Sequence, residues 1–114
     1  MSGKGGSGHF IAMRFTSAAL ALLSVWFVIA IAAGLPDAGY GSVIAFMARP
    51  FNAAGAALLV IMSLAHMSLG MEDVIADYIR KPSTNALLRW SNLIVPAGLC
   101  VLALYAIWRI SFGA

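Results

Sequence analysis

Charge is scarce in this sequence. Lysine, arginine, aspartate and glutamate together make up 10% of its 114 residues, whereas hydrophobic residues make up 62%. A soluble domain usually carries about 25% charged residues, and so short a chain cannot hide this much apolar surface in a core of its own. The mean hydropathy is +0.95. We therefore expect lipid to cover much of the surface.

Other absences exclude further classes of protein. The single cysteine, Cys100, lies in an apolar run, so it forms no intrachain disulfide and fits a small buried hydrophobic residue. The 7 basic and 4 acidic residues form no basic stripe, so no nucleic-acid partner is expected. The glycines near the N-terminus do not have the spacing of a phosphate-binding loop.

Long apolar runs, in contrast, are plentiful. A transmembrane helix needs about 20 apolar residues. The sequence predicts an all-α integral membrane protein with three such helices, over residues 16–34, 51–78 and 87–112. Residues 16–114 would form this transmembrane domain, and the polar, glycine-rich residues 1–15 would form a flexible cytoplasmic segment.

A short interfacial helix is expected before the second span, over residues 40–49. Its apolar side chains are predicted to face lipid: Val43, Ile44, Phe46 and Met47. In the third span, Pro96 is expected to kink the helix. A neighbouring helix, or Ser91 and Asn92, would satisfy the backbone groups that the proline frees.

The basic residues predict the orientation, because cytoplasmic loops carry an excess of lysine and arginine. Five fall on one side of the three spans and two on the other: Lys4, Arg14, Arg80, Lys81 and Arg89 against Arg49 and Arg109. This count places the N-terminus and the second loop inside, in the cytoplasm or its equivalent. We expect the membrane to be a bacterial cytoplasmic membrane in preference to the mitochondrial inner membrane.

The second helix is predicted to extend beyond the membrane. Its apolar run stops near Gly70, but no helix breaker follows until Pro82. At about 100° per residue, six residues fall on one face of this helix: Gly55, Met62, His66, Gly70, Asp73 and Asp77. Tyr78 lies about 120° round the helix from that face.

His66 is the most informative residue on this face. It lies roughly 16 Å along the helix from Asp77, inside the hydrocarbon, where ionisable residues are rare and face protein, a cavity or a cofactor. Three interpretations remain open: a structural histidine bonded to a carbonyl of a neighbouring helix, an axial ligand of haem iron, or a proton relay or substrate site. Gly70, one turn on, fits either a flat macrocycle or close helix packing.

Other polar residues lie near the cytoplasmic side, and some of them allow two interpretations. Glu72 and Asp73 fit a solvated helix end facing Arg80 and Lys81. Asp77 and Tyr78 fit an interfacial anchor, or a phenol that donates a hydrogen bond to a ligand from the bilayer. His9 and Arg14 flank the first span, where Arg14 fits an anchor or a partner for an anion.

The string from His66 to Tyr78 resembles a family pattern, H-x-x-x-G-x-x-x-V-x-x-D-Y. This pattern lies late in the second of three helices in the hydrophobic membrane anchor subunits of succinate dehydrogenase, respiratory complex II. The N-terminal Gly8-His9-Phe10-x-x-x-Arg14 is similar to that family's entry into its first helix. The resemblance covers nearly the whole chain from Gly8.

The resemblance implies roles for individual residues. His66 matches the axial ligand to a b-type haem whose other ligand belongs to the partner cytochrome b556 subunit. Tyr78 matches a tyrosine that hydrogen-bonds a ubiquinone carbonyl, with Asp77 beside it. Arg14 and His9 match residues near the haem propionates or the quinone pocket.

The same resemblance implies partners on the cytoplasmic side. A flavoprotein subunit and an iron–sulfur subunit would oxidise succinate there and pass electrons to quinone. This chain has neither a flavin-binding fingerprint nor a cysteine cluster, so it would not be an enzyme on its own. Three alternatives remain: a haem-free structural anchor, a small multidrug-type transporter subunit, and a b-type cytochrome of another quinone-linked dehydrogenase.

Overall fold

Three long helices and one short helix make up the computed structural model, which describes the backbone of residues 3–113 and the side chains of residues 7–113. The helices are α1 (Gly3–Gly34), α2 (Tyr40–Ala48), α3 (Pro50–Tyr78) and α4 (Pro82–Ser111). By length and composition, α1, α3 and α4 can each cross a membrane. The predicted all-α class, with three spans and a short helix between the first two, is confirmed.

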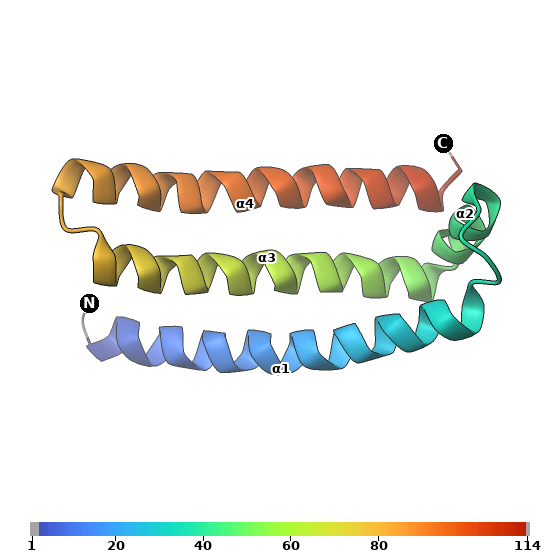
Figure 1. Ribbon diagram of the computed structural model, residues 1–114, viewed down its shortest axis with the longest axis horizontal. Coiled ribbons are helices and arrows are strands. Elements are labelled where there is room, and N and C mark those ends of the chain that lie inside the picture. Colours follow the sequence, from blue (N-terminus) through green and yellow to red (C-terminus); the bar gives the residue numbers. More distant parts are fainter. Residues whose placement is uncertain (1–2, 114) are drawn as a thin grey trace.

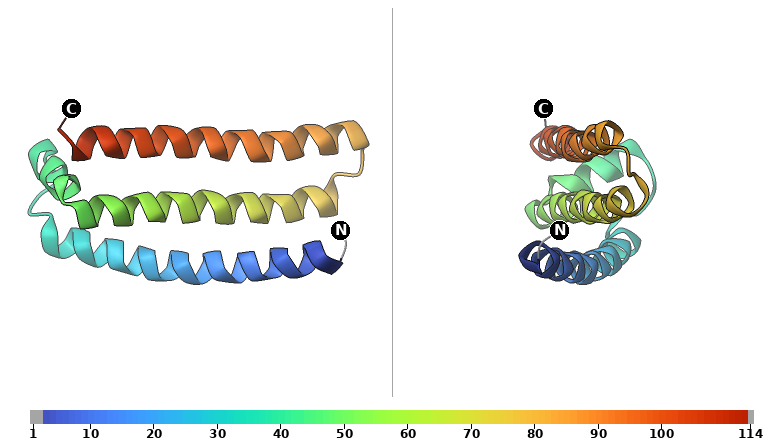
Figure 2. Two further views of the ribbon diagram at one scale, coloured as in Figure 1. Left: turned by 180° about the vertical axis from the view of Figure 1, so that it is seen from behind. Right: turned by 90° about the vertical axis from the view of Figure 1, so that its left-hand side faces the viewer.

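The three long helices lie side by side, with α3 between α1 and α4 (Figures 1 and 2). The described chain measures 50 × 26 × 20 Å along its principal axes, so it is long enough to span a bilayer. The start of α1 and the loop between α3 and α4 lie at one end, whereas α2 and the end of α4 lie at the other (Figure 1). This places the two groups of basic residues at opposite ends of the bundle.

Proline begins both α3 and α4. Pro50 and Pro82 occupy the first turn of their helices, where a missing N–H leaves no hydrogen bond unmade. The last carbonyls of α3 lack helical partners, and the side chain of Asn85 in α4 donates to the Ile79 carbonyl at 2.9 Å. Arg89 in turn donates to the Asn85 side-chain oxygen at 2.7 Å. The turn between α3 and α4 is therefore fixed by side chains as well as by proline.

The short helix α2 was predicted correctly, but two of its side chains do not face lipid. Phe46 and Met47 are buried in a small apolar cluster, and the Phe46 ring packs edge-on against Phe27 of α1, with ring centroids 6.3 Å apart. Val43, as predicted, is exposed. Because α2 is apolar on more than one side, its sequence alone did not reveal which side packs against the bundle.

The first helix begins earlier than the predicted span. The span was expected from residue 16, whereas α1 already begins at Gly3, and residues 1 and 2 lie outside the described part. The flexibility of residues 1–15 stays a prediction. Once an apolar span has nucleated a helix, each added residue gains one hydrogen bond. Glycine weakens such an extension, whereas proline would stop it, and no proline precedes Pro36.

Pro96 lies inside α4 without ending the helix. A proline in a helix frees the carbonyl four residues earlier, which here belongs to Asn92. The Ser68 hydroxyl of α3 donates to this carbonyl at 3.1 Å, and the Asn92 side chain donates back to the Ser68 carbonyl at 2.8 Å. The prediction that a neighbouring helix would satisfy the freed group is therefore confirmed.

Little of the chain's apolar surface is buried within the chain itself. Only 6% of the most apolar stretch of each long helix is buried. Such a surface is stable only in lipid or against other membrane chains, so the fold agrees with a membrane protein that has space for partners.

Candidate functional site

The candidate site lies between α1 and α3. Two polar contacts cross this interface in register: His9 with Asp73, and Thr16 with His66. Thr16 comes seven residues after His9, and His66 comes seven residues before Asp73, as expected for antiparallel helices that meet every two turns. The predicted face of α3 that carries His66 and Asp73 therefore packs against α1.

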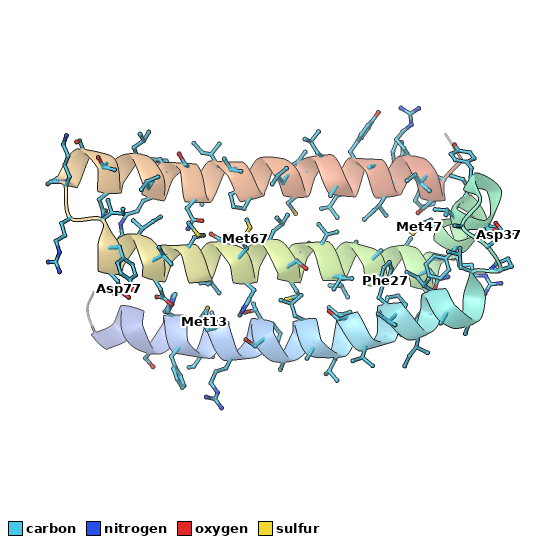
Figure 3. The ribbon with its side chains drawn as sticks, viewed as in Figure 1. Met13, Phe27, Asp37, Met47, Met67 and Asp77 are labelled. Carbon is cyan, nitrogen blue, oxygen red and sulfur yellow. The ribbon has the colours of Figure 1, made fainter. Side chains whose placement is uncertain are left out.

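Close packing at the other end of this interface brings the helices together. A Cβ atom on Gly55 would overlap the indole ring of Trp26 on α1. Phe27, labelled in Figure 3, lies one residue further along α1. A small residue at position 55 thus lets α1 approach α3 closely, as in many membrane helix pairs.

His66 is partly buried, and its Nδ1 atom lies 2.9 Å from the Thr16 hydroxyl oxygen. The sequence left open a bond to a backbone carbonyl of a neighbouring helix, but the partner is this hydroxyl. The other ring nitrogen, Nε2, has no hydrogen-bond partner among the described residues and is not one of their fully buried polar atoms. It is therefore not fully enclosed by the described residues and keeps some surface on which a group outside this chain could bind.

Thr16 is among the least exposed polar residues, with 6% of its surface accessible. Its hydroxyl lies 2.8 Å from the Ala12 carbonyl oxygen and 3.2 Å from that of Met13, both in the preceding turn of α1. Met13 lies between α1 and α3 in Figure 3 and marks the level of this contact. Sequence reasoning missed Thr16, although its spacing of seven residues from His9 could have placed it on the same face.

His9 and Asp73 form the second contact, nearer the end of the bundle. His9 Nε2 lies 2.8 Å from an oxygen of the Asp73 carboxylate. The approach is not aligned as a hydrogen bond, because Nε2 still lacks a well-oriented acceptor. The contact is therefore a close approach of an imidazole nitrogen to a carboxylate oxygen across the interface between α1 and α3. Asp73 was expected to face Arg80 and Lys81, but the recorded partner in the described part of the chain is His9.

Arg14 lies elsewhere. It is exposed, and its guanidinium carbon is 5.2 Å from the centre of the Phe10 ring on the same helix. Arg14 and Phe10 line a shallow surface hollow on α1 together with Met13. The structure therefore does not bring Arg14 into contact with His66, and it leaves this cation free to meet a group outside the chain.

Asp77 and Tyr78 lie in the last turn of α3, and both are exposed. Asp77 points from the end of α3 that lies beside the start of α1 (Figure 3). The Tyr78 side chain is 77% exposed, so its hydroxyl is open to lipid, solvent or a partner. The predicted extension of the helix to Tyr78 is confirmed.

For binding a cofactor, this interface offers one imidazole nitrogen that is not fully enclosed, Nε2 of His66. No group of three or more metal-binding side chains occurs in the described part of the chain, so these residues do not form a closed site for a metal ion. A Cβ atom at Gly70, one turn from His66, would meet nothing within 4 Å, which leaves open space on the same face. An accessible nitrogen beside open space suits a flat cofactor shared with a second chain.

The sequence is similar to known membrane proteins. The profile of the family described as "Succinate dehydrogenase/Fumarate reductase transmembrane subunit" matches residues 2–106. Three relatives named "Succinate dehydrogenase hydrophobic membrane anchor subunit" are also similar. The one from Rickettsia conorii is 36% identical over 78 residues, and the one from Rickettsia bellii is 37% identical over 78 residues.

The third relative, from Paracoccus denitrificans, is 30% identical over 109 residues, which cover 96% of this chain and 83% of the relative. The matches to the two Rickettsia proteins cover 68% of this chain and 62% of each relative, so less than two thirds of those proteins is matched. The family profile extends over nearly the whole of the described bundle. The chain belongs to the family of transmembrane subunits of succinate dehydrogenase and fumarate reductase.

Proposed function

We propose that this chain is the membrane anchor subunit of a succinate:quinone oxidoreductase and that His66 supplies one axial ligand to haem b. The observation that supports this most directly is the state of the His66 ring: Nδ1 is bonded within the bundle, and Nε2 is accessible. The chain itself offers one such ligand, so the second axial ligand would come from a partner cytochrome b subunit.

The surroundings of His66 fit a haem. A neutral imidazole binds iron through one nitrogen while the other nitrogen is held by a neighbouring group, and Thr16 holds Nδ1 of His66 in this way. The open space at Gly70 leaves room for a flat ring. When bound, haem b would supply a one-electron redox centre within the membrane.

Tyr78 and Asp77 would contribute to the ubiquinone site. Both are exposed in the last turn of α3, in the interfacial layer where a quinone headgroup can enter from the bilayer. The phenol would donate a hydrogen bond to a quinone carbonyl, and the Asp77 carboxylate would sit beside it. Tyrosine suits this position because its ring is apolar and its hydroxyl is polar.

Arg14 and His9 would lie near the haem propionates or the quinone pocket. Arg14 has no carboxylate partner among the described residues, so its cation is available to a haem propionate. His9 already contacts Asp73, so its role would be to hold the start of α1 against the extension of α3. Arg14 would therefore contact the haem directly, whereas His9 would act through the packing of α1 on α3.

The basic residues support a place in the bacterial cytoplasmic membrane with the N-terminus in the cytoplasm. The start of α1 and the loop between α3 and α4 lie at the same end of the bundle and carry the larger group of lysines and arginines. The iron–sulfur and flavoprotein subunits would dock at this end, beside Tyr78. The chain would pass electrons from the iron–sulfur subunit to ubiquinone and would have no catalytic residue for succinate oxidation.

One alternative has an observation in its favour. The hydrogen bond between Thr16 and His66 satisfies one ring nitrogen within the chain, which is what a haem-free structural anchor would also need. In that case the accessible Nε2 would bond to a polar group of a partner helix instead of iron.

Purification of the tagged chain from membranes in mild detergent tests the proposal. A flavoprotein, an iron–sulfur protein and a second small membrane chain should co-purify, and the complex should contain one b-type haem with a reduced absorption spectrum. The same four chains without haem would support the haem-free anchor. Recovery of this chain without the other three would contradict the anchor function itself.

A further inference from the structure

The Thr16 hydroxyl has three polar neighbours but only one proton to donate. Two of them are the carbonyl oxygens of Ala12 and Met13, at 2.8 and 3.2 Å, and the third is His66 Nδ1 at 2.9 Å. A carbonyl oxygen only accepts hydrogen bonds, whereas a neutral imidazole nitrogen either donates or accepts. The two carbonyls therefore restrict where the proton can point.

If the hydroxyl donated to His66 Nδ1, its oxygen would face both carbonyl oxygens without a proton between them. At 2.8 Å, such an oxygen–oxygen contact to Ala12 is repulsive. A threonine in a helix commonly donates to the carbonyl of the preceding turn, and this geometry is the one observed. The hydroxyl oxygen then has lone pairs left, so the His66 Nδ1 atom carries the hydrogen and donates it to Thr16.

This arrangement selects one tautomer of His66. With the hydrogen on Nδ1, the neutral ring has its free lone pair on Nε2, which is the nitrogen that remains accessible. Thr16 can select this tautomer because its side chain is buried and its hydroxyl is held by a hydrogen bond to its own helix. A buried, anchored acceptor fixes the ring orientation more firmly than water would.

We propose that Thr16 is a positioning residue for the haem ligand: it fixes the Nδ1–H tautomer of His66 and so leaves the Nε2 lone pair available to bind iron. This inference depends on the proposed function, in which His66 binds haem. Groups that hold the second nitrogen of a ligating histidine set its orientation and raise its basicity, and their loss typically weakens metal binding about 10- to 100-fold.

The test replaces Thr16 in the whole complex. Thr16→Val keeps the shape of the side chain but removes the hydroxyl, whereas Thr16→Ser keeps the hydroxyl. Ser24→Ala removes an exposed hydroxyl elsewhere on α1 and serves as the matched control. Three properties are measured on purified complexes: haem content, the midpoint potential of the haem, and its low-spin electron paramagnetic resonance spectrum.

We expect Thr16→Val to weaken haem retention about 10- to 100-fold. The haem that remains should have a more positive midpoint potential, because a less basic ligand stabilises the oxidised iron less, and its largest g value should shift. Thr16→Ser and Ser24→Ala should match the wild type in all three properties. Wild-type potential and resonance spectrum in Thr16→Val would overturn the inference, as would failure of Thr16→Ser to match the wild type.

Two further variants, Thr16→Ala and His66→Ala, distinguish a failure of assembly, an error in the role of Thr16 and an error in the haem-ligand assignment. If Thr16→Val prevents the four subunits from co-purifying, Thr16→Ala removes the same hydroxyl with less bulk, and an unchanged haem spectrum there overturns the inference. A His66→Ala complex provides the reference. If His66→Ala loses haem but the threonine variants behave as wild type, only the role of Thr16 is wrong. If His66→Ala keeps an unchanged haem, the ligand assignment and the role of Thr16 are both wrong.

Discussion

The hydroxyl of Ser68 in α3 donates a hydrogen bond to the backbone carbonyl of Asn92 in α4, and Pro96 is the reason that this carbonyl needs a donor. The proline removes the N–H that would otherwise bond to it. Ser68 lies two residues after His66, so this contact fixes the side of α3 that faces α4 while Thr16 holds the side that faces α1.

Ser68→Ala should therefore destabilise the bundle by about 0.6 kcal/mol and by no more than about 1.7 kcal/mol, the mean and the maximum measured for hydrogen bonds between membrane helices. Thermal denaturation of the purified complex in detergent measures the effect. Pro96→Ala restores a backbone N–H to the Asn92 carbonyl, so the loss on adding Ser68→Ala should be smaller in that background. An equal loss in both backgrounds would show that Ser68 does not compensate for the proline. Ser63→Ala, an exposed position on α3, is the control.

Gly55→Ala should disrupt the contact between α1 and α3. Its added methyl group would overlap the Trp26 ring, so either the ring or the helix must move, and overpacking of this kind typically costs about 1 to 3 kcal/mol. The melting temperature of the complex should fall, and Trp26→Leu should restore part of it. Gly98→Ala is the matched control, because a methyl group there meets nothing within 4 Å. Equal effects of the two glycine variants would contradict the close approach at Gly55.

The contact between His9 and Asp73 should make the two side chains interdependent. His9→Gln, Asp73→Asn and the double variant form a cycle in which the two losses of stability are not additive. The coupling should be at most about 1 kcal/mol, because ion pairs near the surface are weak, and it should decrease as salt is raised. Additive losses at both low and high salt would indicate that the two side chains do not interact.

Tyr78→Phe tests the quinone site. Loss of one hydrogen bond worth about 0.5 to 1.5 kcal/mol should lower succinate:ubiquinone turnover about two- to tenfold. Succinate oxidation with an artificial dye acceptor should be unchanged, because it does not need the quinone site. Tyr40→Phe, an exposed tyrosine at the opposite end of the bundle, is the control. Equal loss in the two assays would place the defect in assembly instead of quinone binding.

The sequence was sufficient to predict the helices, because hydropathy and the positions of proline determine spans in a membrane. The extension of α3 to Tyr78 followed from the absence of a breaker before Pro82. The common face of Gly55, His66 and Asp73 followed from helical periodicity alone. The sequence could not identify α1 as the helix that this face meets, because lipid and protein neighbours of a membrane helix are equally apolar.

Sequence analysis missed several packing contacts for the same reason: an apolar side chain fits lipid and a neighbouring helix equally well. Phe46 and Met47 pack inside the bundle, yet their apolar character fits lipid equally well. Thr16 and Ser68 are small hydroxyl residues inside apolar runs, and their importance depends on a partner in another helix. Asp73 lies near several cations in sequence, and only the packing of α1 on α3 selects His9 as its contact.

The central claim is that His66 binds haem iron, and the most direct test is the reduced-minus-oxidised absorption spectrum of the purified four-subunit complex carrying His66→Ala. His9→Ala, which removes the other histidine of the chain, separates loss of the iron ligand from loss of a side chain that would only lie near the cofactor. We predict that the b-type haem spectrum is lost or altered in His66→Ala and keeps its low-spin form in His9→Ala. A His66→Ala complex with wild-type haem content and an unchanged spectrum would contradict the assignment.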